Sequence, residues 1–211
     1  MGTKPLVSII TPTWQRHELL RETIDDVRRQ TYRPLEHVVV SDGPDDPLMD
    51  ALVYSDLQRI TDPRWVDLRS AELGRNWSTF LPRSFGVAPL TVGAMLARGE
   101  YHMWLCDDER MQPDHVAHLV ELIERTCADF VYPQVLMWKT AHPGVAWTIG
   151  TDPPEYGQIT NFLYRASALQ KAMYRFDIPV EGDWDMVSRW MEAGATWAMS
   201  DRCTISHRAD H

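Results

Sequence analysis

The segment from Leu6 to Gly43, LVSIITPTWQRHELLRETIDDVRRQTYRPLEHVVVSDG, changes its hydrophobic period twice. Residues 6–10 form a short β-branched run, which predicts a buried strand followed by a loop. Over residues 17–30 the apolar side chains recur at helical spacing, and residues 37–40 form a second apolar run before a Ser-Asp-Gly-Pro turn. A strand, a helix and a strand in this order predict a βαβ unit, and therefore a parallel sheet.

The same alternation continues along the chain, so we expect an α/β fold with a mostly parallel central sheet flanked by helices. A loop-rich stretch covers residues 71–86, and Pro113 is expected to be the first residue of a helix. The other predicted strands are residues 65–68, 101–106, 130–138, 145–149, 196–199 and 203–207, and the other predicted helices are residues 47–60, 87–98, 166–174 and 183–193.

The composition is that of an ordinary globular protein. The chain has 211 residues, 44% hydrophobic and 24% charged, which predicts a single domain. No apolar run approaches the ~20 residues that span a bilayer, so we expect a cytoplasmic protein. The net charge of -9 gives no general footprint for nucleic acid and disfavours a nucleic-acid acceptor without excluding it. Three cysteines without metal-ligand spacing favour free thiols.

Three polar segments follow predicted strands: residues 11–13, 41–43 and 106–109. The last of these contains three consecutive acids, Asp107, Asp108 and Glu109. Ligands of open α/β sheets bind beyond the carboxyl ends of the strands, so the three segments should meet at one edge. Adjacent carboxylates repel each other, and a divalent cation relieves that repulsion. The alternative is an acidic loop that stabilises the start of the following helix.

Four motifs, in chain order, together resemble family 2 of the glycosyltransferases. They are LVSIITPTWQR at residues 6–16, HVVVSDG at 37–43, GEYHMWLCDDERMQPDHV at 99–116 and GDWDMVSRWMEAG at 182–194. The resemblance runs from about Pro5 to His207. It implies the GT-A nucleotide-diphosphosugar-binding fold, with a nucleotide-sugar-binding half over about residues 1–112 and an acceptor-side half over about 113–211.

The resemblance implies a nucleotide-sugar site at the strand ends. Thr11, Pro12 and Thr13 match the family's Pro-Thr-Tyr-Asn-Arg loop, which lines the base and the ribose, while Trp14 replaces the usual Tyr. Asp42 stands where the family's strand-end acid hydrogen-bonds the base, commonly uracil. A turn residue that stabilises its own backbone is the alternative for Asp42.

The resemblance also implies a metal site for Mn²⁺ or Mg²⁺. Counting back from Pro113 puts Cys106 at the first Asp of the family's Asp-x-Asp motif and Asp108 at the second. Asp108 is then the metal ligand, Asp107 a ribose contact and Glu109 a possible support. Cys106 departs from the pattern and is not expected to be a ligand, because thiolates suit softer metals.

Two further positions are implied on the acceptor side. Asp183 aligns with the family's general base, although Gly182 replaces the usual Glu before it, and a helix cap is the alternative. Asp185 is expected to pair with Arg189 at i,i+4 spacing. His207 aligns with a strand-ending His that reaches the metal or the diphosphate, and a structural His is the alternative.

The cation that meets the diphosphate is left open, because the family's usual Arg-Asn-x-Gly stretch is absent. Arg75 and Arg83 are the candidates, and a solvated arginine is the alternative for each. Trp138 and Trp147 fall where the family builds its acceptor side, and no role is assigned to them.

The sequence thus predicts an inverting, metal-dependent glycosyltransferase that uses a nucleotide diphosphate sugar, with a UDP-sugar favoured, and a hydroxyl acceptor of unknown class. A catalytically silent nucleotide-sugar-binding module is the first alternative. A sugar-phosphate nucleotidyltransferase is the second, and the absence of glycine from TPTWQR counts against it.

Overall fold

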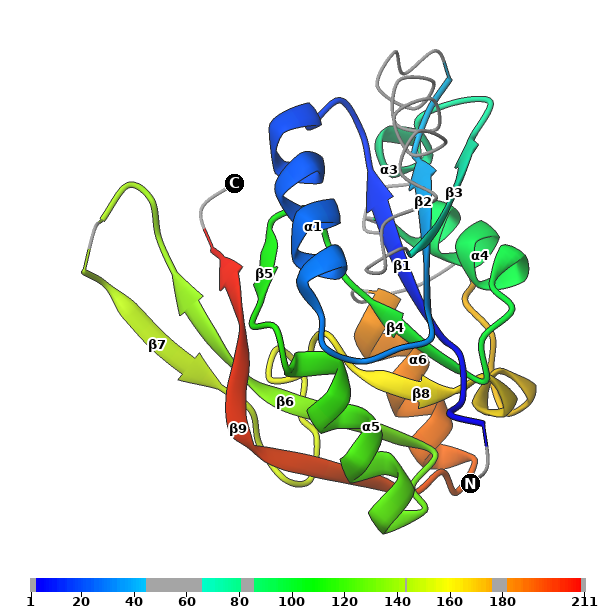
Figure 1. The fold of residues 1–211 in the computed structure, drawn as a ribbon, viewed down its shortest axis with the longest axis vertical. Coiled ribbons are helices and arrows are strands. Elements are labelled where there is room, and N and C mark those ends of the chain that lie inside the picture. Colours follow the sequence, from blue (N-terminus) through cyan, green and yellow to red (C-terminus); the bar gives the residue numbers. More distant parts are fainter. Residues whose placement is uncertain (1–2, 45–65, 81–85, 143, 176–181, 210–211) are drawn as a thin grey trace.

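The computed structural model describes residues 3–44, 66–80, 86–142, 144–175 and 182–209. The predicted helix at 47–60 and Arg83 lie outside these residues. Within them, nine strands form one sheet in the order β3-β2-β1-β4-β8-β6-β9-β5, with β7 paired to β6 (Figure 1). The strands are β1 Val7–Thr13, β2 Leu35–Ser41, β3 Asp67–Glu72, β4 Tyr101–Trp104, β5 Glu109–Met111, β6 Phe130–Trp138, β7 Ala146–Ile149, β8 Leu163–Arg165 and β9 Trp197–Arg208.

The sheet has a parallel half and a mixed half. Strands β3, β2, β1 and β4 are parallel, as the βαβ pattern predicts. Strand β8 then pairs antiparallel with β4 and β6, β7 pairs antiparallel with β6, and β5 pairs antiparallel with β9, whereas β6 and β9 are parallel. The expected α/β architecture is confirmed, and the parallel arrangement holds for its N-terminal part.

Helices cover both faces of the sheet. They are α1 His17–Arg29, α3 Trp77–Phe80, α4 Val87–Leu96, α5 His115–Thr126 and α6 Gly182–Glu192, with a 3₁₀ helix at Ala166–Gln170. One buried cluster joins α1 and α5 to one face, and a second joins α4 and α6 to the other (Figure 1). Helix α4 approaches β1 so closely that a Cβ on Gly93 would lie 2.3 Å from Ile10 Cγ2, so this position requires glycine.

Several predicted boundaries are wrong. Helix α5 begins at His115, two residues after Pro113, and Glu109 opens strand β5 instead of lying in a loop. The helix expected at 166–174 is a short 3₁₀ helix, and the two late strands are one strand, β9. Strand β3 runs to Glu72 and α3 follows, within the stretch expected to be loop-rich. Tertiary pairing overrides local pattern in these short segments.

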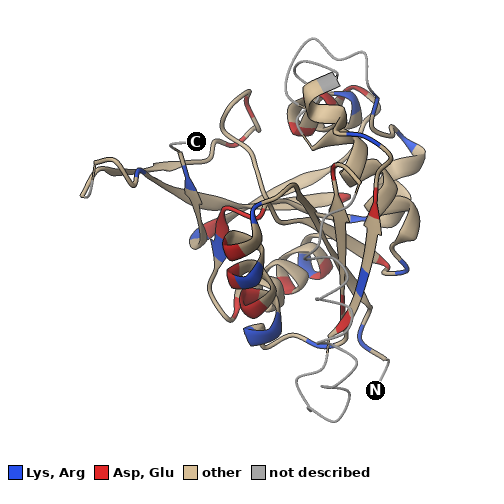
Figure 2. Ribbon diagram, turned by 90° about the horizontal axis from the view of Figure 1, so that it is seen from above, with Lys and Arg blue, Asp and Glu red and all other residues tan. Residues whose placement is uncertain are grey.

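Strands β6 and β7 form a hairpin that projects from the rest of the sheet, at the left of both views (Figures 1 and 2). Residues 131–150 contain no Asp or Glu, although the chain as a whole is acidic. Trp147 on β7 is 40% exposed.

No helix of the described residues has the length and apolar character that crossing a bilayer requires. The cytoplasmic location stays a prediction.

Candidate functional site

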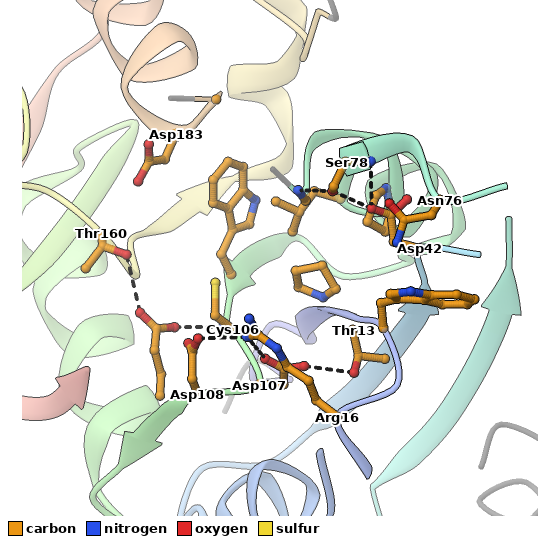
Figure 3. A pocket seen from close by; sticks show the side chains of 18 of the residues that line it. Thr13, Arg16, Asp42, Asn76, Ser78, Cys106, Asp107, Asp108, Thr160 and Asp183 are labelled. Carbon is orange, nitrogen blue, oxygen red and sulfur yellow. Dashed lines mark hydrogen bonds and ion pairs between the residues drawn. The ribbon is translucent and has the colours of Figure 1, made fainter. Parts of the chain in front are cut away.

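A cavity of about 770 Å³ opens at the carboxyl ends of β1, β2 and β4. It is lined by residues from the loops after these strands, from α3, from the first turn of α6 and from the end of β9. Asp42, Asn76 and Ser78 lie at one end and Asp183 and Thr160 at the other (Figure 3). The three polar strand ends predicted to share one edge do meet there.

Asp107 and Asp108 form the floor of the cavity. Their side chains are 4% and 6% exposed, and both contact one nitrogen of Arg16: Nη1 lies 3.0 Å from Asp107 Oδ1 and 3.0 Å from Asp108 Oδ2 (Figure 3). Thr13 Oγ1 donates a 2.9 Å hydrogen bond to Asp107 Oδ2. Burial raises the pKa of Asp107, while Arg16 and Thr13 oppose that rise. A charged hydrogen bond from Arg16 thus offsets the cost of burying two adjacent acids.

Glu109 connects three segments that are far apart in the sequence. Its Oε2 accepts a 2.7 Å hydrogen bond from the backbone N–H of Cys106 and another from Asn161 Nδ2, and its Oε1 accepts a 3.3 Å hydrogen bond from Thr160. His207 Nδ1 lies 3.5 Å from the same Oε1. The side chain of Glu109 is 1% exposed. These contacts suit the supporting position expected for Glu109.

His207 stands between the acids and the end of β9. Its Nδ1 lies 3.8 Å from Asp108 Oδ1. Burial by itself lowers the pKa of His207, but Glu109, Asp108 and Asp183 outweigh it, so the pKa is raised above its ordinary value. The raised pKa of the imidazole is thus a consequence of the carboxylates that surround it at this end of the cavity.

Cys106 also lines the cavity, as a half-buried thiol among carboxylates. Burial raises its pKa well above the ordinary value, and Glu109, Asp108, Asp107 and Asp183 raise it further. The thiol therefore keeps its proton near neutral pH, and a protonated thiol is a poor metal ligand. This agrees with leaving Cys106 out of the ligand set.

Asp42 lines the other end of the cavity and also begins helix α3. Its Oδ1 accepts a 2.9 Å hydrogen bond from the N–H of Trp77, and its Oδ2 accepts one of 3.1 Å from the N–H of Ser78 and another from the Ser78 hydroxyl. These contacts differ from the alternative considered for Asp42, because the stabilised backbone is that of helix α3, 35 residues further along the chain, and not its own turn.

Trp14 forms a wall beside Asp42. A Cβ on Gly43 would lie 2.3 Å from the indole ring, so the ring rests against the backbone at a glycine. Trp14 also lines a second cavity of about 600 Å³ together with Gly74, Arg75, Asn76 and Thr79. The guanidinium of Arg75 lies 5.6 Å from the centroid of the Trp77 ring. Arg75 is therefore at the rim, outside the lining of the main cavity.

The two acids in the first turn of α6 point to different surroundings. Asp183 lines the cavity, and its Oδ1 accepts a 2.7 Å hydrogen bond from the N–H of Trp184. Asp185 is buried and accepts two hydrogen bonds from Arg175, at 3.0 and 2.7 Å, and two from Arg189, at 2.9 and 2.7 Å. The predicted Asp185–Arg189 pair is confirmed.

Most residues expected at the site share this cavity. They are Pro12, Thr13, Asp42, Asp107, Asp108, Asp183 and His207. Thr11 lies deeper, where its buried hydroxyl is 2.9 Å from His37 Nε2. Trp138 and Trp147 lie on the β6–β7 hairpin and do not line the cavity.

Arg16, Ser78 and Trp104 line the cavity and were not predicted to. The signal for Arg16 was present, because the loop it ends matches a family motif that closes with Arg. Ser78 and Trp104 carry no such signal, since their places depend on how α3 and β4 pack.

The residues at the acidic end fit a divalent metal only in part. Among the described residues, no group of three His, Cys, Asp or Glu side chains is arranged to hold an ion. Asp108 and His207 nevertheless face each other at the cavity wall. Mg²⁺ is commonly bound by one or two carboxylates, with substrate phosphates and waters completing the shell. The donor set therefore fits a metal that arrives with a diphosphate.

Comparison with known proteins defines the class of this fold. TarS of Staphylococcus aureus in complex with UDP-GlcNAc aligns over 97% of this chain and 58% of its own, with a TM-score of 0.71 and 17% identity. The mannosyltransferase PcManGT of Pyrobaculum calidifontis, in complex with GDP-Man and Mn²⁺, aligns over 97% of this chain and 57% of its own, with a TM-score of 0.69 and 16% identity. The chain has the GT-A fold of such glycosyltransferases.

Sequence comparison adds a partial match to one family. Residues 8–65 match the sequence model described as Glycosyl transferase family 2. An uncharacterized glycosyltransferase of Rickettsia typhi is 29% identical over 122 residues, which are 57% of this chain and 33% of that protein. Together with the GT-A fold, these partial matches make the chain similar to the glycosyltransferases of family 2. The chain spans about a third or less of the first curated relatives.

Proposed function

We propose that this protein transfers a sugar from a nucleoside diphosphate sugar to an acceptor hydroxyl, with inversion at the anomeric carbon. One observation carries the proposal: a single cavity brings together Asp42, the pair Asp107 and Asp108, and Asp183, although the first and the last are 141 residues apart in the sequence. The cavity has room for a nucleotide sugar, since ligand sites of this kind are about 300–1,000 Å³.

The nucleotide would lie at the end formed by Trp14, Asp42 and Ser78. The indole offers a flat face for a base. Asp42 accepts three hydrogen bonds from Trp77 and Ser78, and because a carboxylate has about four acceptor sites, one is left for a base N–H. Asp107 would accept a hydrogen bond from a ribose hydroxyl. The fold neighbours carry UDP-GlcNAc in one case and GDP-Man in the other, and a uridine donor is our proposal.

Asp183 would act as the general base. Its carboxylate takes the proton of the acceptor hydroxyl as the hydroxyl oxygen bonds to the anomeric carbon. The bond from that carbon to the diphosphate breaks on the opposite face, and the nucleoside diphosphate leaves with the electron pair. Asp108 and His207 would hold a divalent metal, Mn²⁺ or Mg²⁺, whose charge neutralises the leaving diphosphate when it is bound. Glu109, which contacts the Cys106 backbone and His207, would keep these groups in place.

The test is a thermal-shift screen with UDP, GDP and their sugars, with and without Mn²⁺, followed by a hydrolysis assay. Binding raises the apparent stability by mass action, so the cognate donor with Mn²⁺ should raise Tm. The same donor should be hydrolysed slowly when Mn²⁺ is present. If no nucleotide sugar changes Tm, the proposal is wrong. Binding without any hydrolysis would instead favour a catalytically silent module.

A further inference from the structure

Arg16 bridges the two acids that the proposed function assigns to the ribose and the metal. One nitrogen, Nη1, lies 3.0 Å from an oxygen of each carboxylate. The acids are almost fully buried, whereas the side chain of Arg16 is 45% exposed. A single cation that reaches in from the rim of the cavity therefore neutralises half of the charge of a buried carboxylate pair.

This arrangement affects how a metal meets Asp108. One oxygen of Asp108 already accepts the guanidinium, and the other faces His207. A divalent ion that arrives alone meets the guanidinium of Arg16 at short range, and like charges at such distances repel by several kcal/mol in a partly buried site. A diphosphate changes that balance, because it attracts both the ion and the guanidinium.

Arg16 is also well placed to contact the donor diphosphate, a role to which the sequence assigns no residue. Of the described residues that line the cavity, it is the one Lys or Arg side chain. Its guanidinium lies between the nucleotide end and the acidic end of the cavity (Figure 3). Arginine presents a planar fork that matches phosphate oxygens.

We propose, on the basis of the proposed function, that Arg16 is the cation that contacts the donor diphosphate, and that its contact with Asp108 weakens when the donor brings the divalent metal to that carboxylate. In the donor-free protein Arg16 occupies the acid pair, and the metal binds weakly. With donor present, Arg16 turns to the diphosphate and Asp108 becomes available to the metal.

Mn²⁺ alone is the first probe. Free and bound Mn²⁺ are measured by electron paramagnetic resonance in the absence of nucleotide, on the wild type and on Arg16→Gln. We expect Arg16→Gln to bind Mn²⁺ about tenfold more tightly than the wild type, because the competing charged hydrogen bond is gone. Arg16→Lys, which keeps the charge, should stay near the wild type. Circular dichroism melting confirms that the variants are folded.

UDP and GDP with saturating Mn²⁺ are the second probe, measured by calorimetry. We expect Arg16→Gln to lose at least about tenfold in affinity for the nucleoside diphosphate that the wild type binds, and to lose little for the monophosphate. Arg21→Gln is the matched control, since it removes the same charge from an exposed position on helix α1, which begins directly after Arg16. It should leave both affinities unchanged.

Two results overturn this role for Arg16. The first is equal Mn²⁺ affinity in the wild type and Arg16→Gln without nucleotide. The second is unchanged diphosphate affinity in Arg16→Gln. If neither UDP nor GDP binds the wild type, the proposed function fails, whereas the Mn²⁺ measurement still decides whether Arg16 competes for Asp108.

Discussion

Two clusters of aspartate and arginine side chains in this protein have opposite ratios of acids to arginines. At the cavity floor, one arginine, Arg16, forms ion pairs with two buried acids, Asp107 and Asp108. At α6, one buried acid, Asp185, forms ion pairs with two arginines, Arg175 before the helix and Arg189 within it. Both clusters lie beside a predicted motif, and both are held by hydrogen bonds of about 3 Å.

The difference lies in what each cluster still lacks. Both oxygens of Asp185 are already met by guanidinium groups, so nothing further is needed there. The cavity cluster keeps an excess of negative charge, which also raises the pKa of His207. Perturbed groups in a cleft mark a functional site more often than a saturated ion pair does. The proportion of acids to cations thus separates a ligand site from a structural clamp.

Asp108→Asn should have the largest effect. The amide keeps the shape but removes the charge that attracts a metal and Arg16, so both sugar transfer and Mn²⁺-assisted donor binding should be abolished. The measurement is donor hydrolysis or transfer, with Tm as the check on folding. Full activity in this variant would remove Asp108 from the proposed metal site.

Asp183→Asn should lower turnover by about 10²–10⁴-fold, the usual contribution of a general base. Donor affinity, measured by calorimetry with Mn²⁺, should stay within a few-fold of the wild type, because the proposed base contacts the acceptor. Loss of donor binding with turnover per bound donor intact would assign Asp183 to the donor instead.

Asp185→Asn tests the clamp and should affect stability first. It removes a charge that two arginines contact, and each charged hydrogen bond contributes about 1.5–3 kcal/mol before screening of partly exposed partners. We expect the free energy of unfolding in urea to fall by about 2 kcal/mol while the folded protein still binds donor. A stable variant that no longer binds donor would make Asp185 part of the site.

His207→Gln should give the smallest change, in the pH dependence of stability without metal. The native pKa of His207 is raised above about 6.5, so the folded state holds the proton more tightly than the unfolded chain. The stabilisation is therefore complete below about pH 6.5 and is lost as the pH rises through the native pKa. The stability difference between wild type and variant, measured in EDTA at pH 6 and pH 8.5, should shrink at the higher pH. A difference independent of pH would contradict this origin.

The sequence predicts the N-terminal half of the fold well. Strands β1, β2 and β4 and helix α1 have strong periodicity, and their ends bring Thr13, Asp42 and Asp108 to one edge by the geometry of parallel strands alone. Short elements of the second half, such as β5 and β8, have three residues each, which is too few for a pattern to emerge. Their existence depends on partners far along the chain.

The site was predictable where a motif matched and the backbone alone fixed the position. The contacts of Arg16 were not, because they depend on which side chains meet across the cavity. For Glu109 the sequence predicted a supporting place but not its partners Thr160 and Asn161. Asp42 shows the same limit: the sequence offered a turn or a base contact, whereas its carboxylate begins helix α3. Side-chain partners of this kind follow from tertiary packing, which no local pattern records.

The contacts of Glu109 have a consequence for the order in which the site forms during synthesis. Glu109 pairs with His207 across β5 and β9, and it holds the Thr160–Asn161 segment and the Cys106 backbone. A chain translated only as far as residue 196 has Trp14, Asp42 and the acid pair, but it lacks strand β9. The ribosome therefore synthesises every residue at the nucleotide end before it reaches His207, which is the last of the described lining residues in the chain.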